Sequence, residues 1–174
     1  MGVKKIVLLG YMGSGKSTIA RLLSESLGIP YLDLDEIIEK KTNQTVKNIF
    51  ETKGEIYFRK IEHEIFRDLM MNSEKMILSL GGGTPCYANN HEFLNGEGVV
   101  SIYLRASIDT LYNRLKSEKD KRPLVANESE EELREFIAKH LFDRSYYYNQ
   151  ATLKIDVDDK SPQMIVEEIK WKLA

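Results

Sequence analysis

Short apolar runs alternate along this chain with longer stretches in which apolar residues recur every three or four positions. The runs predict buried strands over about 4–9, 31–33, 76–80, 99–104 and 152–157. The periodic stretches predict helices over about 19–28, 35–41, 45–72 with a break at Gly54, 107–116, 131–150 and 162–174. Strands that alternate with helices pair in parallel, because each helix carries the chain back across the sheet. The pattern therefore predicts a three-layer α/β/α fold with a five-stranded parallel sheet and helices on both faces.

The segment between the first strand and the first helix carries the clearest chemical motif, Gly10-Tyr11-Met12-Gly13-Ser14-Gly15-Lys16-Ser17-Thr18. It matches G-x-x-x-x-G-K-[ST] in the strand–loop–helix context that a phosphate loop needs. The backbone N–H groups of such a loop form a nest for phosphate at a helix N-terminus. Lys16 can reach the β- and γ-phosphates, and the Ser17 hydroxyl can ligate Mg²⁺. A tight turn without a ligand is the alternative, but the lysine and serine at these offsets favour binding of a nucleoside triphosphate.

Two acidic residues, Asp33 and Asp35, follow the second predicted strand. In extended backbone the side chains at positions i and i+2 point the same way, so both carboxylates are expected to face the nucleotide. One would act through the hydration shell of Mg²⁺, and the other would accept a proton from a substrate hydroxyl. An N-cap pair before the helix at Glu36 is the other interpretation. The nearby phosphate loop favours the catalytic one.

A glycine triplet and two arginines give weaker signals. Gly81-Gly82-Gly83 follows the third strand and indicates either close approach of the backbone to a ligand or a flexible loop before Pro85. Arg59 lies one helical turn from Glu62, which could hold its guanidinium in place. A planar guanidinium suits a small carboxylate. A solvated ion pair without a ligand is the alternative for Arg59, and the same alternative applies to Arg144.

The charged stretch 116–131 has little apolar periodicity and contains Arg122. A mobile lid is expected here, whose arginine would reach the transferring phosphoryl group on closure and help to exclude water. A solvated loop is the alternative. The three histidines are dispersed, and their spacing does not predict a metal site.

Composition limits the partners of this 174-residue chain, which fits one domain spanning 1–174. The 25 basic and 27 acidic residues give a net charge of −2, which provides no basic field for nucleic acid, so none is expected as a partner. The apolar runs are far too short to span a bilayer, and no membrane is expected either. The single cysteine, Cys86, fits a reducing compartment, so a cytoplasmic location is expected.

The chain resembles the shikimate kinases, small members of the nucleoside-monophosphate-kinase-like group of P-loop proteins. The resemblance covers essentially the whole chain. It rests on Gly10–Thr18, Leu32-Asp33-Leu34-Asp35, Ile49-Phe50 with Gly54-Glu55 and Phe58-Arg59, Leu78–Gly83, Arg122-Pro123-Leu124 and the Arg144…Tyr148 spacing. It implies a P-loop kinase domain with a substrate-binding helical region at about 34–72 and a lid at about 116–128.

The activity that the resemblance implies is transfer of the γ-phosphate of ATP to the 3-hydroxyl of shikimate. Lys16, Asp35 and Arg122 match the family's catalytic positions. Asp35 would hold the ring hydroxyls and accept the proton. Ser17 and Asp33 would be the Mg²⁺ partners, Ser17 directly and Asp33 through water. A monomer that acts on small molecules is expected.

The remaining assignments concern substrate and nucleotide contacts. Arg59 and Arg144 resemble the pair that clamps the shikimate carboxylate, and Gly82 would contact the substrate through its backbone. The apolar side of the pocket would consist of Ile49, Phe50 and Phe58. The nucleotide would be bound by Gly13, Ser14, Gly15, Lys16, Ser17, Thr18, Arg114, Arg122 and Lys160.

Two other functions stay open at this point. The chain could be a kinase for another small hydroxylated metabolite, such as gluconate or a nucleotide, or a non-catalytic switch module that depends on nucleotide. Gluconate kinases resemble this chain in the phosphate loop but not in the glycine triplet or in Phe58-Arg59. The switch is disfavoured because the lysine, serine, aspartates and lid arginine of a catalyst are all present.

Overall fold

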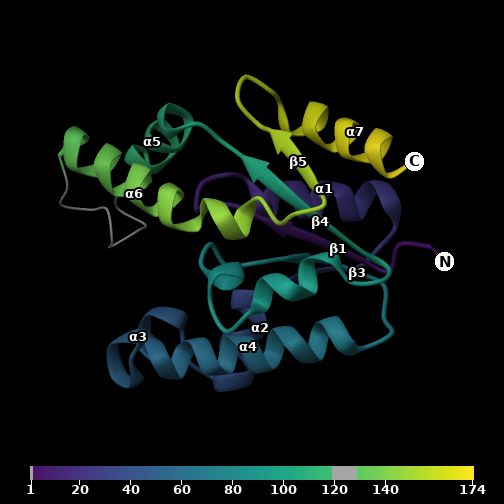
Figure 1. Ribbon diagram of the computed structural model, residues 1–174, viewed down its shortest axis with the longest axis horizontal. Coiled ribbons are helices and arrows are strands. Elements are labelled where there is room, and N and C mark those ends of the chain that lie inside the picture. Colours follow the sequence, from purple (N-terminus) through teal and green to yellow (C-terminus); the bar gives the residue numbers. More distant parts are fainter. Residues whose placement is uncertain (1, 119–128) are drawn as a thin grey trace.

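Five parallel strands form the centre of the structure, a computed structural model that describes residues 2–118 and 129–174 (Figure 1). The strands are β1 (Lys5–Leu9), β2 (Tyr31–Asp33), β3 (Met76–Ser79), β4 (Val99–Arg105) and β5 (Leu153–Asp156). Their spatial order is β2-β3-β1-β4-β5, and each pairing is parallel. The predicted five-stranded parallel sheet is confirmed.

Strand β1 lies in the middle of the sheet. Val7 pairs with Leu78 of β3 on one side and with Ser101 of β4 on the other. Every residue of β1 is buried, as a strand covered on both faces requires. This position explains why the run Ile6–Leu9 is continuously apolar rather than alternating.

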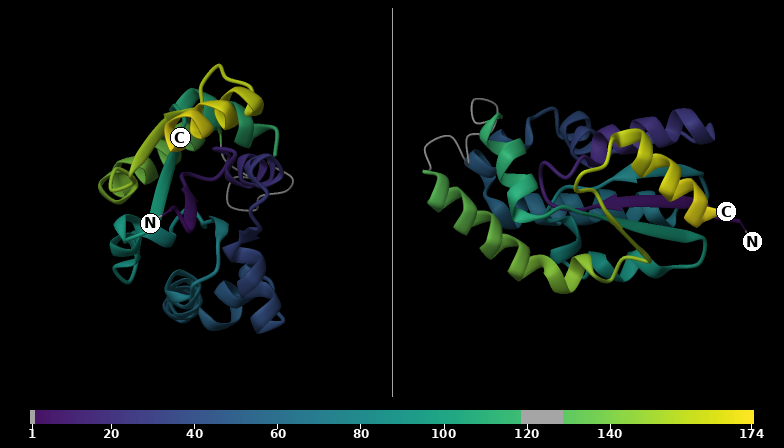
Figure 2. Two further views of the ribbon diagram at one scale, coloured as in Figure 1. Left: turned by 90° about the vertical axis from the view of Figure 1, so that its right-hand side faces the viewer. Right: turned by 90° about the horizontal axis from the view of Figure 1, so that it is seen from above.

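Helices cover both faces of the sheet (Figure 2). Helices α1 (Lys16–Leu27) and α7 (Pro162–Leu173) pack against each other on one face. The 3₁₀ segment η2 (Asn90–Asn95) and helix α6 (Glu130–Tyr148) cover the other face, and α4 (Glu55–Met71) packs beside η2. The remaining elements are α2 (Leu34–Thr42), α3 (Val46–Lys53), η1 (Thr84–Cys86) and α5 (Ile108–Lys116). The three-layer prediction is therefore confirmed.

The helix boundaries follow local signals in the sequence. Gly28 ends α1 in the left-handed conformation, with φ of 67°. Gly54, with φ of 86°, separates α3 from α4 at the predicted break. Ser129 and Glu132 form a capping box that starts α6. The 3₁₀ segments η1 and η2 were not predicted, because such short segments have no helical period to detect.

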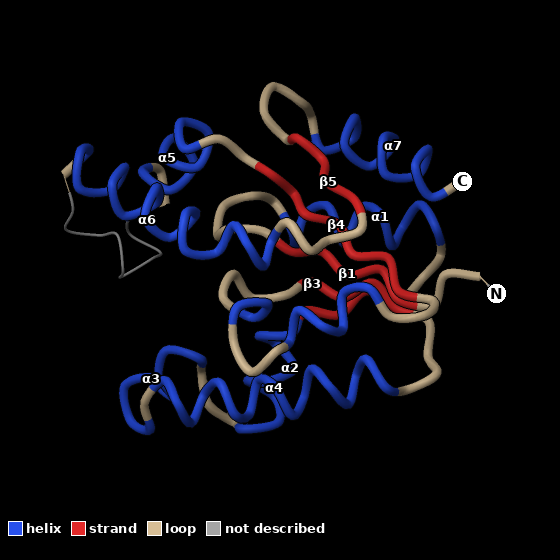
Figure 3. The backbone as a smooth tube through the Cα atoms, viewed as in Figure 1, coloured by secondary structure: helices blue, strands red, loops and turns tan. Residues whose placement is uncertain are grey.

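The parallel arrangement brings the carboxyl ends of the strands to one edge of the sheet. Figure 3 shows the loops that leave β1 and β3 on this side. The part of the chain that the structure describes contains no helix long and apolar enough to cross a membrane. Arg122 and most of the predicted lid lie outside the described residues, so the lid remains a prediction.

Candidate active site

A cavity of about 540 Å³ opens at the carboxyl edge of the sheet. Its walls come from the loop after β1, the start of α1, the β2–α2 junction, the loop after β3, and helices α5 and α7. The predicted site residues that line it are Gly13, Ser14, Gly15, Lys16, Ser17, Thr18, Asp33, Asp35, Gly82, Arg114 and Lys160. The structure therefore brings together residues that lie far apart in the sequence.

The phosphate loop has the backbone conformation that only glycine adopts easily. Gly13 and Gly15 have φ of 84° and 100°. A Cβ atom on Gly10 would lie only 2.8 Å from the carbonyl oxygen of Leu104. Gly15 starts α1 without a side-chain cap, which leaves the N–H groups of the first turn available to an anion. Lys16 lies across the loop, and its Nζ donates to the carbonyl oxygen of Gly10 at 2.7 Å.

Two cations lie at the nucleotide end of the cavity. Arg114, from α5, donates from Nη1 to the carbonyl oxygen of Gly13 at 2.9 Å, so it holds the phosphate loop. Lys160 pairs with Glu168 at 2.7 Å. Pro162 lines the same end. Arg114 and Lys160 were assigned to the nucleotide by resemblance alone, and the structure brings them to the cavity wall.

Asp33 confirms the N-cap interpretation and also lines the cavity, while its role at Mg²⁺ remains a prediction. Its Oδ1 accepts from the backbone N–H of Glu36 at 3.1 Å and so caps α2. Its Oδ2 accepts from the Ser17 hydroxyl at 3.3 Å. A hydroxyl and a carboxylate side by side fit Mg²⁺, which prefers oxygen ligands and keeps several of its water molecules.

The geometric argument for Asp35 was wrong, although its location was right. Asp35 lies in the first turn of α2, not in extended backbone, because the helix begins at Leu34. Both aspartates still face the cavity, since the chain turns from strand to helix between them. Burial raises the pKa of Asp35 to about 6, and the charges of Asp33 and Glu62 add to this effect.

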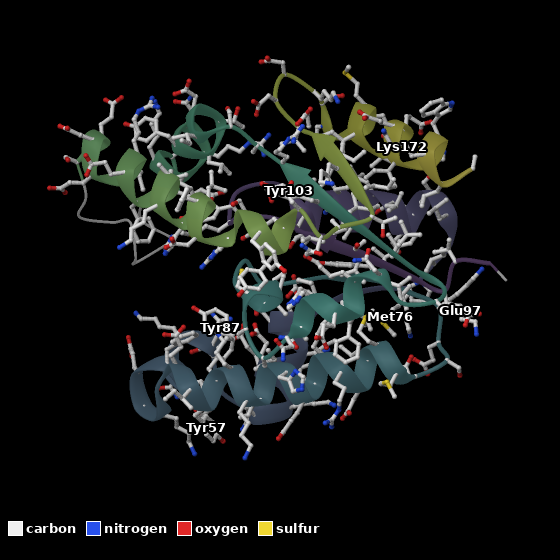
Figure 4. All side chains as sticks on the ribbon, viewed as in Figure 1. Tyr57, Met76, Tyr87, Glu97, Tyr103 and Lys172 are labelled. Carbon is white, nitrogen blue, oxygen red and sulfur yellow. The ribbon has the colours of Figure 1, made fainter. Side chains whose placement is uncertain are left out.

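Arg59 reaches the glycine triplet from α4. A Cβ atom on Gly83 would lie 2.6 Å from Nη2 of Arg59, so a side chain there would displace the guanidinium. Nη1 donates to Oε1 of Glu62 at 2.9 Å, and Glu62 is only 1% exposed. The ring of Tyr87, labelled in Figure 4, lies 4.0 Å from the guanidinium carbon. The interpretation of Arg59 as a solvated ion pair is therefore wrong.

Arg144 reaches the same loop from α6. A Cβ atom on Gly82 would lie 3.1 Å from its Nη1. One turn along the helix, the Tyr148 hydroxyl donates to the carbonyl oxygen of Gly82 at 2.5 Å and lies 3.5 Å from Arg144 Nη1. Burial raises the pKa of Tyr148, which keeps this hydroxyl protonated as a donor. The sequence analysis used the Arg144…Tyr148 spacing only as part of the resemblance and gave Tyr148 no role, although residues at i and i+4 meet on one helix face.

The close approach that the glycine triplet permits is thus to two guanidinium groups of the protein itself. The sequence interpretation had invoked a ligand. Cys86 lies near both arginines, yet burial raises the pKa of its thiol to about 11. The protonated thiol is a poor nucleophile.

The predicted apolar wall is a small aromatic cluster. The rings of Phe50 and Phe58 lie 4.5 Å apart between centroids, and the guanidinium carbon of Arg59 lies 5.2 Å from the centroid of the Phe58 ring. Phe58 is 3% exposed and Ile49 is 1% exposed. The Phe50 and Phe58 rings lie beside the Arg59 guanidinium, and contact of the three apolar side chains with a substrate remains a prediction.

A phosphate loop at the carboxyl edge of a parallel sheet, with Lys16 and the partly buried Asp35 lining one cavity, is the arrangement of a P-loop kinase. Comparison with known proteins shows to which family of P-loop kinases the chain belongs. The family model for shikimate kinase matches residues 12–174. The chain therefore belongs to the shikimate kinase family.

Individual shikimate kinases are similar to this chain over nearly its full length. A shikimate kinase of Flavobacterium johnsoniae is 62% identical over 172 residues, which cover 99% of this chain and 100% of the relative. The crystal structure of shikimate kinase from Bacteroides thetaiotaomicron superposes with a TM-score of 0.89 at 32% identity and covers 97% of both chains. Shikimate kinase from Acinetobacter baumannii, solved in complex with shikimate, has a TM-score of 0.85 at 31% identity and covers 98% of this chain and 93% of that one.

The raised pKa of Asp35 predicts a cost in stability. The folded state holds the Asp35 proton up to pH about 6, whereas the pKa of an ordinary aspartate carboxyl is 3.8. The free energy of unfolding therefore falls as pH rises across this window. We expect Asp35→Asn to increase the free energy of unfolding by about 1–3 kcal/mol near neutral pH, and the gain to vanish below pH about 4.

Urea unfolding followed by circular dichroism at several pH values measures this difference. Asp156→Asn is the matched control, because Arg105 lowers the pKa of Asp156 and the substitution should bring no gain. An Asp35→Asn protein that is no more stable than the original near neutral pH would contradict the raised pKa.

Proposed function

We propose that this protein transfers the γ-phosphoryl group of ATP to the 3-hydroxyl of shikimate and releases shikimate 3-phosphate and ADP. Family membership over nearly the whole chain supports the activity. The observation that carries the assignment of the site is the convergence of two arginines on a glycine loop beside a carboxylate of raised pKa. A ring with one acid group and several hydroxyls needs such partners.

The acid end of the substrate binds to Arg59 and Arg144 in this proposal. Each guanidinium can donate two parallel hydrogen bonds to a carboxylate. Glu62 and Tyr148 already restrain the two arginines, so less side-chain entropy is lost when the substrate binds. The backbone N–H of Gly82 supplies a further donor at the same place.

Asp35 acts as the proton acceptor. The substrate hydroxyl oxygen forms a bond to the γ-phosphorus, and the bond from this phosphorus to the β,γ-bridging oxygen breaks. The hydroxyl proton passes to Asp35, and ADP leaves with the bridging oxygen. A pKa of about 6 leaves Asp35 ionised near neutral pH while keeping it basic enough to take the proton.

The triphosphate binds in the nest formed by residues 13–18, and Lys16 turns from the loop carbonyls to the β- and γ-phosphates. Ser17 and Asp33 would hold Mg²⁺, the aspartate through water. The ion neutralises charge on the phosphates when it is bound. Arg114 and Lys160 flank the base. Arg122 closes on the phosphoryl group as the lid arginine.

The enzyme works as a monomer in the cytoplasm in this proposal. The single cysteine fits a reducing compartment. Family membership disfavours a gluconate or nucleotide kinase, and the proton-accepting carboxylate of Asp35 disfavours a non-catalytic switch.

A panel of acceptors tests the activity directly. We expect ADP release, measured in a coupled assay, to be fast with shikimate and slow with gluconate, with nucleoside monophosphates or without an acceptor. The Lys16→Ala variant is the control for a contaminating kinase, because it removes the charge at the phosphates. Preference for gluconate would favour the alternative kinase, and ADP release that ignores every acceptor would favour the switch.

Removal of one arginine tests the acid-binding site. We expect Arg59→Ala to raise the KM for shikimate by roughly 10- to 150-fold, because it removes charged hydrogen bonds worth about 1.5–3 kcal/mol. The KM for ATP should change little, since Arg59 lies at the other end of the site. Steady-state kinetics measure both constants.

Arg67→Ala on the same helix is the matched control, because Arg67 is half exposed and pairs with Asp68 at the surface. An unchanged shikimate KM in Arg59→Ala would remove Arg59 from the site. A similar rise in the Arg67→Ala variant would point to a general effect on α4.

A further inference from the structure

The loop after β3 is joined to α4 through a buried carboxylate. Thr84, the residue directly after the glycine triplet, is 0% exposed, and its hydroxyl donates to Oε2 of Glu62 at 2.9 Å. The other oxygen of Glu62 accepts from Arg59 Nη1 at 2.9 Å. One carboxylate thus bridges a hydroxyl on the loop and the guanidinium assigned to the substrate acid.

The backbone around Thr84 is held in place independently of this hydroxyl. Its N–H donates to the carbonyl oxygen of Gly81 at 3.2 Å. Its carbonyl oxygen accepts from Nδ2 of the buried Asn90 at 2.9 Å. Asn90 in turn contacts His63 of α4 through its Oδ1 at 2.6 Å. The direction of the hydroxyl therefore follows from two elements, η2 and α4.

The Thr84 hydroxyl restricts rotation of the Glu62 carboxylate. The terminal torsion of a glutamate is broad, so a single hydrogen bond to Arg59 does not fix the plane of the carboxylate. A second bond, from Thr84 to the other oxygen, does fix it. It also satisfies an oxygen that would otherwise be buried without a partner at a cost in free energy.

The same hydroxyl lies close to the reacting end of the site. A Cβ atom on Gly81 would lie 3.1 Å from Oγ1 of Thr84, 3.3 Å from Oδ1 of Asp35 and 3.6 Å from Oε2 of Glu62. The hydroxyl and both carboxylates therefore surround one glycine. Since the hydroxyl bonds to Glu62, that carboxylate is held toward Arg59.

We propose that Thr84 is a positioning residue for substrate binding, which orients Glu62 so that the Arg59 guanidinium faces the glycine loop. This inference rests on the proposed function, in which Arg59 binds the acid group of shikimate. Thr84 itself does not contact the substrate. Its effect is transmitted through Glu62, so it concerns binding of the acid and not the phosphoryl transfer step.

Substitution of the hydroxyl alone tests this role. Thr84→Val removes the donor and nearly keeps the shape, and Thr84→Ser keeps the donor. We expect Thr84→Val to raise the KM for shikimate about three- to tenfold, with kcat and the KM for ATP within about twofold of the original protein. Thr84→Ser should restore the KM to within about twofold. Calorimetric titration with shikimate gives the same comparison as a Kd.

The control is Thr42→Val, which removes a hydroxyl that donates to the carbonyl oxygen of Ile38 within α2. It should leave the shikimate KM unchanged. If Thr84→Val does not fold, Thr84→Ala removes the same hydroxyl without placing a methyl group against the carboxylate, and its KM decides the question.

The outcomes separate the two proposals. An original protein that does not phosphorylate shikimate would overturn the proposed function, and this inference with it. An active protein whose shikimate KM is the same in Thr84→Val would overturn the positioning role alone. A lower unfolding temperature with an unchanged KM, or a Thr84→Ser variant as poor as Thr84→Val, would show that Thr84 only stabilises the loop.

Discussion

Parallel pairing of β1 with β3 and β4 is the constraint on which the site depends. Because the strands run in one direction, the phosphate loop after β1, Asp33 after β2 and the glycine triplet after β3 all emerge at one edge of the sheet. Strand β1 is buried on both faces, and its pairing places Val7 beside Leu78 of β3 and Ser101 of β4. A shift of one residue along β1 would turn each side chain to the opposite face of the sheet and displace the phosphate loop relative to Asp33 and the glycine triplet.

Different surroundings give the carboxylates of Glu62 and Asp35 different properties. Glu62 is buried, but its two oxygens are bonded to Arg59 and Thr84, so its charge is compensated. Burial is the main factor that disfavours the ionised form of Asp35, and it therefore raises the pKa of this carboxyl. Two acids a few ångströms apart thus suit different tasks, one as a holder of an arginine and one as a proton acceptor. The glycine loop between them leaves room for both.

Much of the fold could be predicted because its signals are local. Gly28, Gly54 and Ser129 mark helix boundaries through backbone conformation or a side-chain cap, and both act within a few residues. The wrong expectation that Asp35 lies in extended backbone also came from reasoning about neighbouring residues alone. The i, i+2 argument assumed that the strand continued, whereas Asp33 caps a helix that begins at the next residue. Asp33 is both the last residue of β2 and the N-cap of α2, and the pattern of apolar residues does not separate these two roles.

The amino-acid sequence by itself determined the alternation of strands and helices, the phosphate loop and the family, since these depend on periodicity and on fixed spacing. The tertiary structure decided which groups meet across long separations. Arg59, Arg144 and the glycine triplet lie on three different segments, and only packing of α4 and α6 around the loop after β3 brings them together. Burial depends on that packing too, so the pKa of Asp35 and the bonds of Thr84 and Tyr148 follow from the folded chain alone.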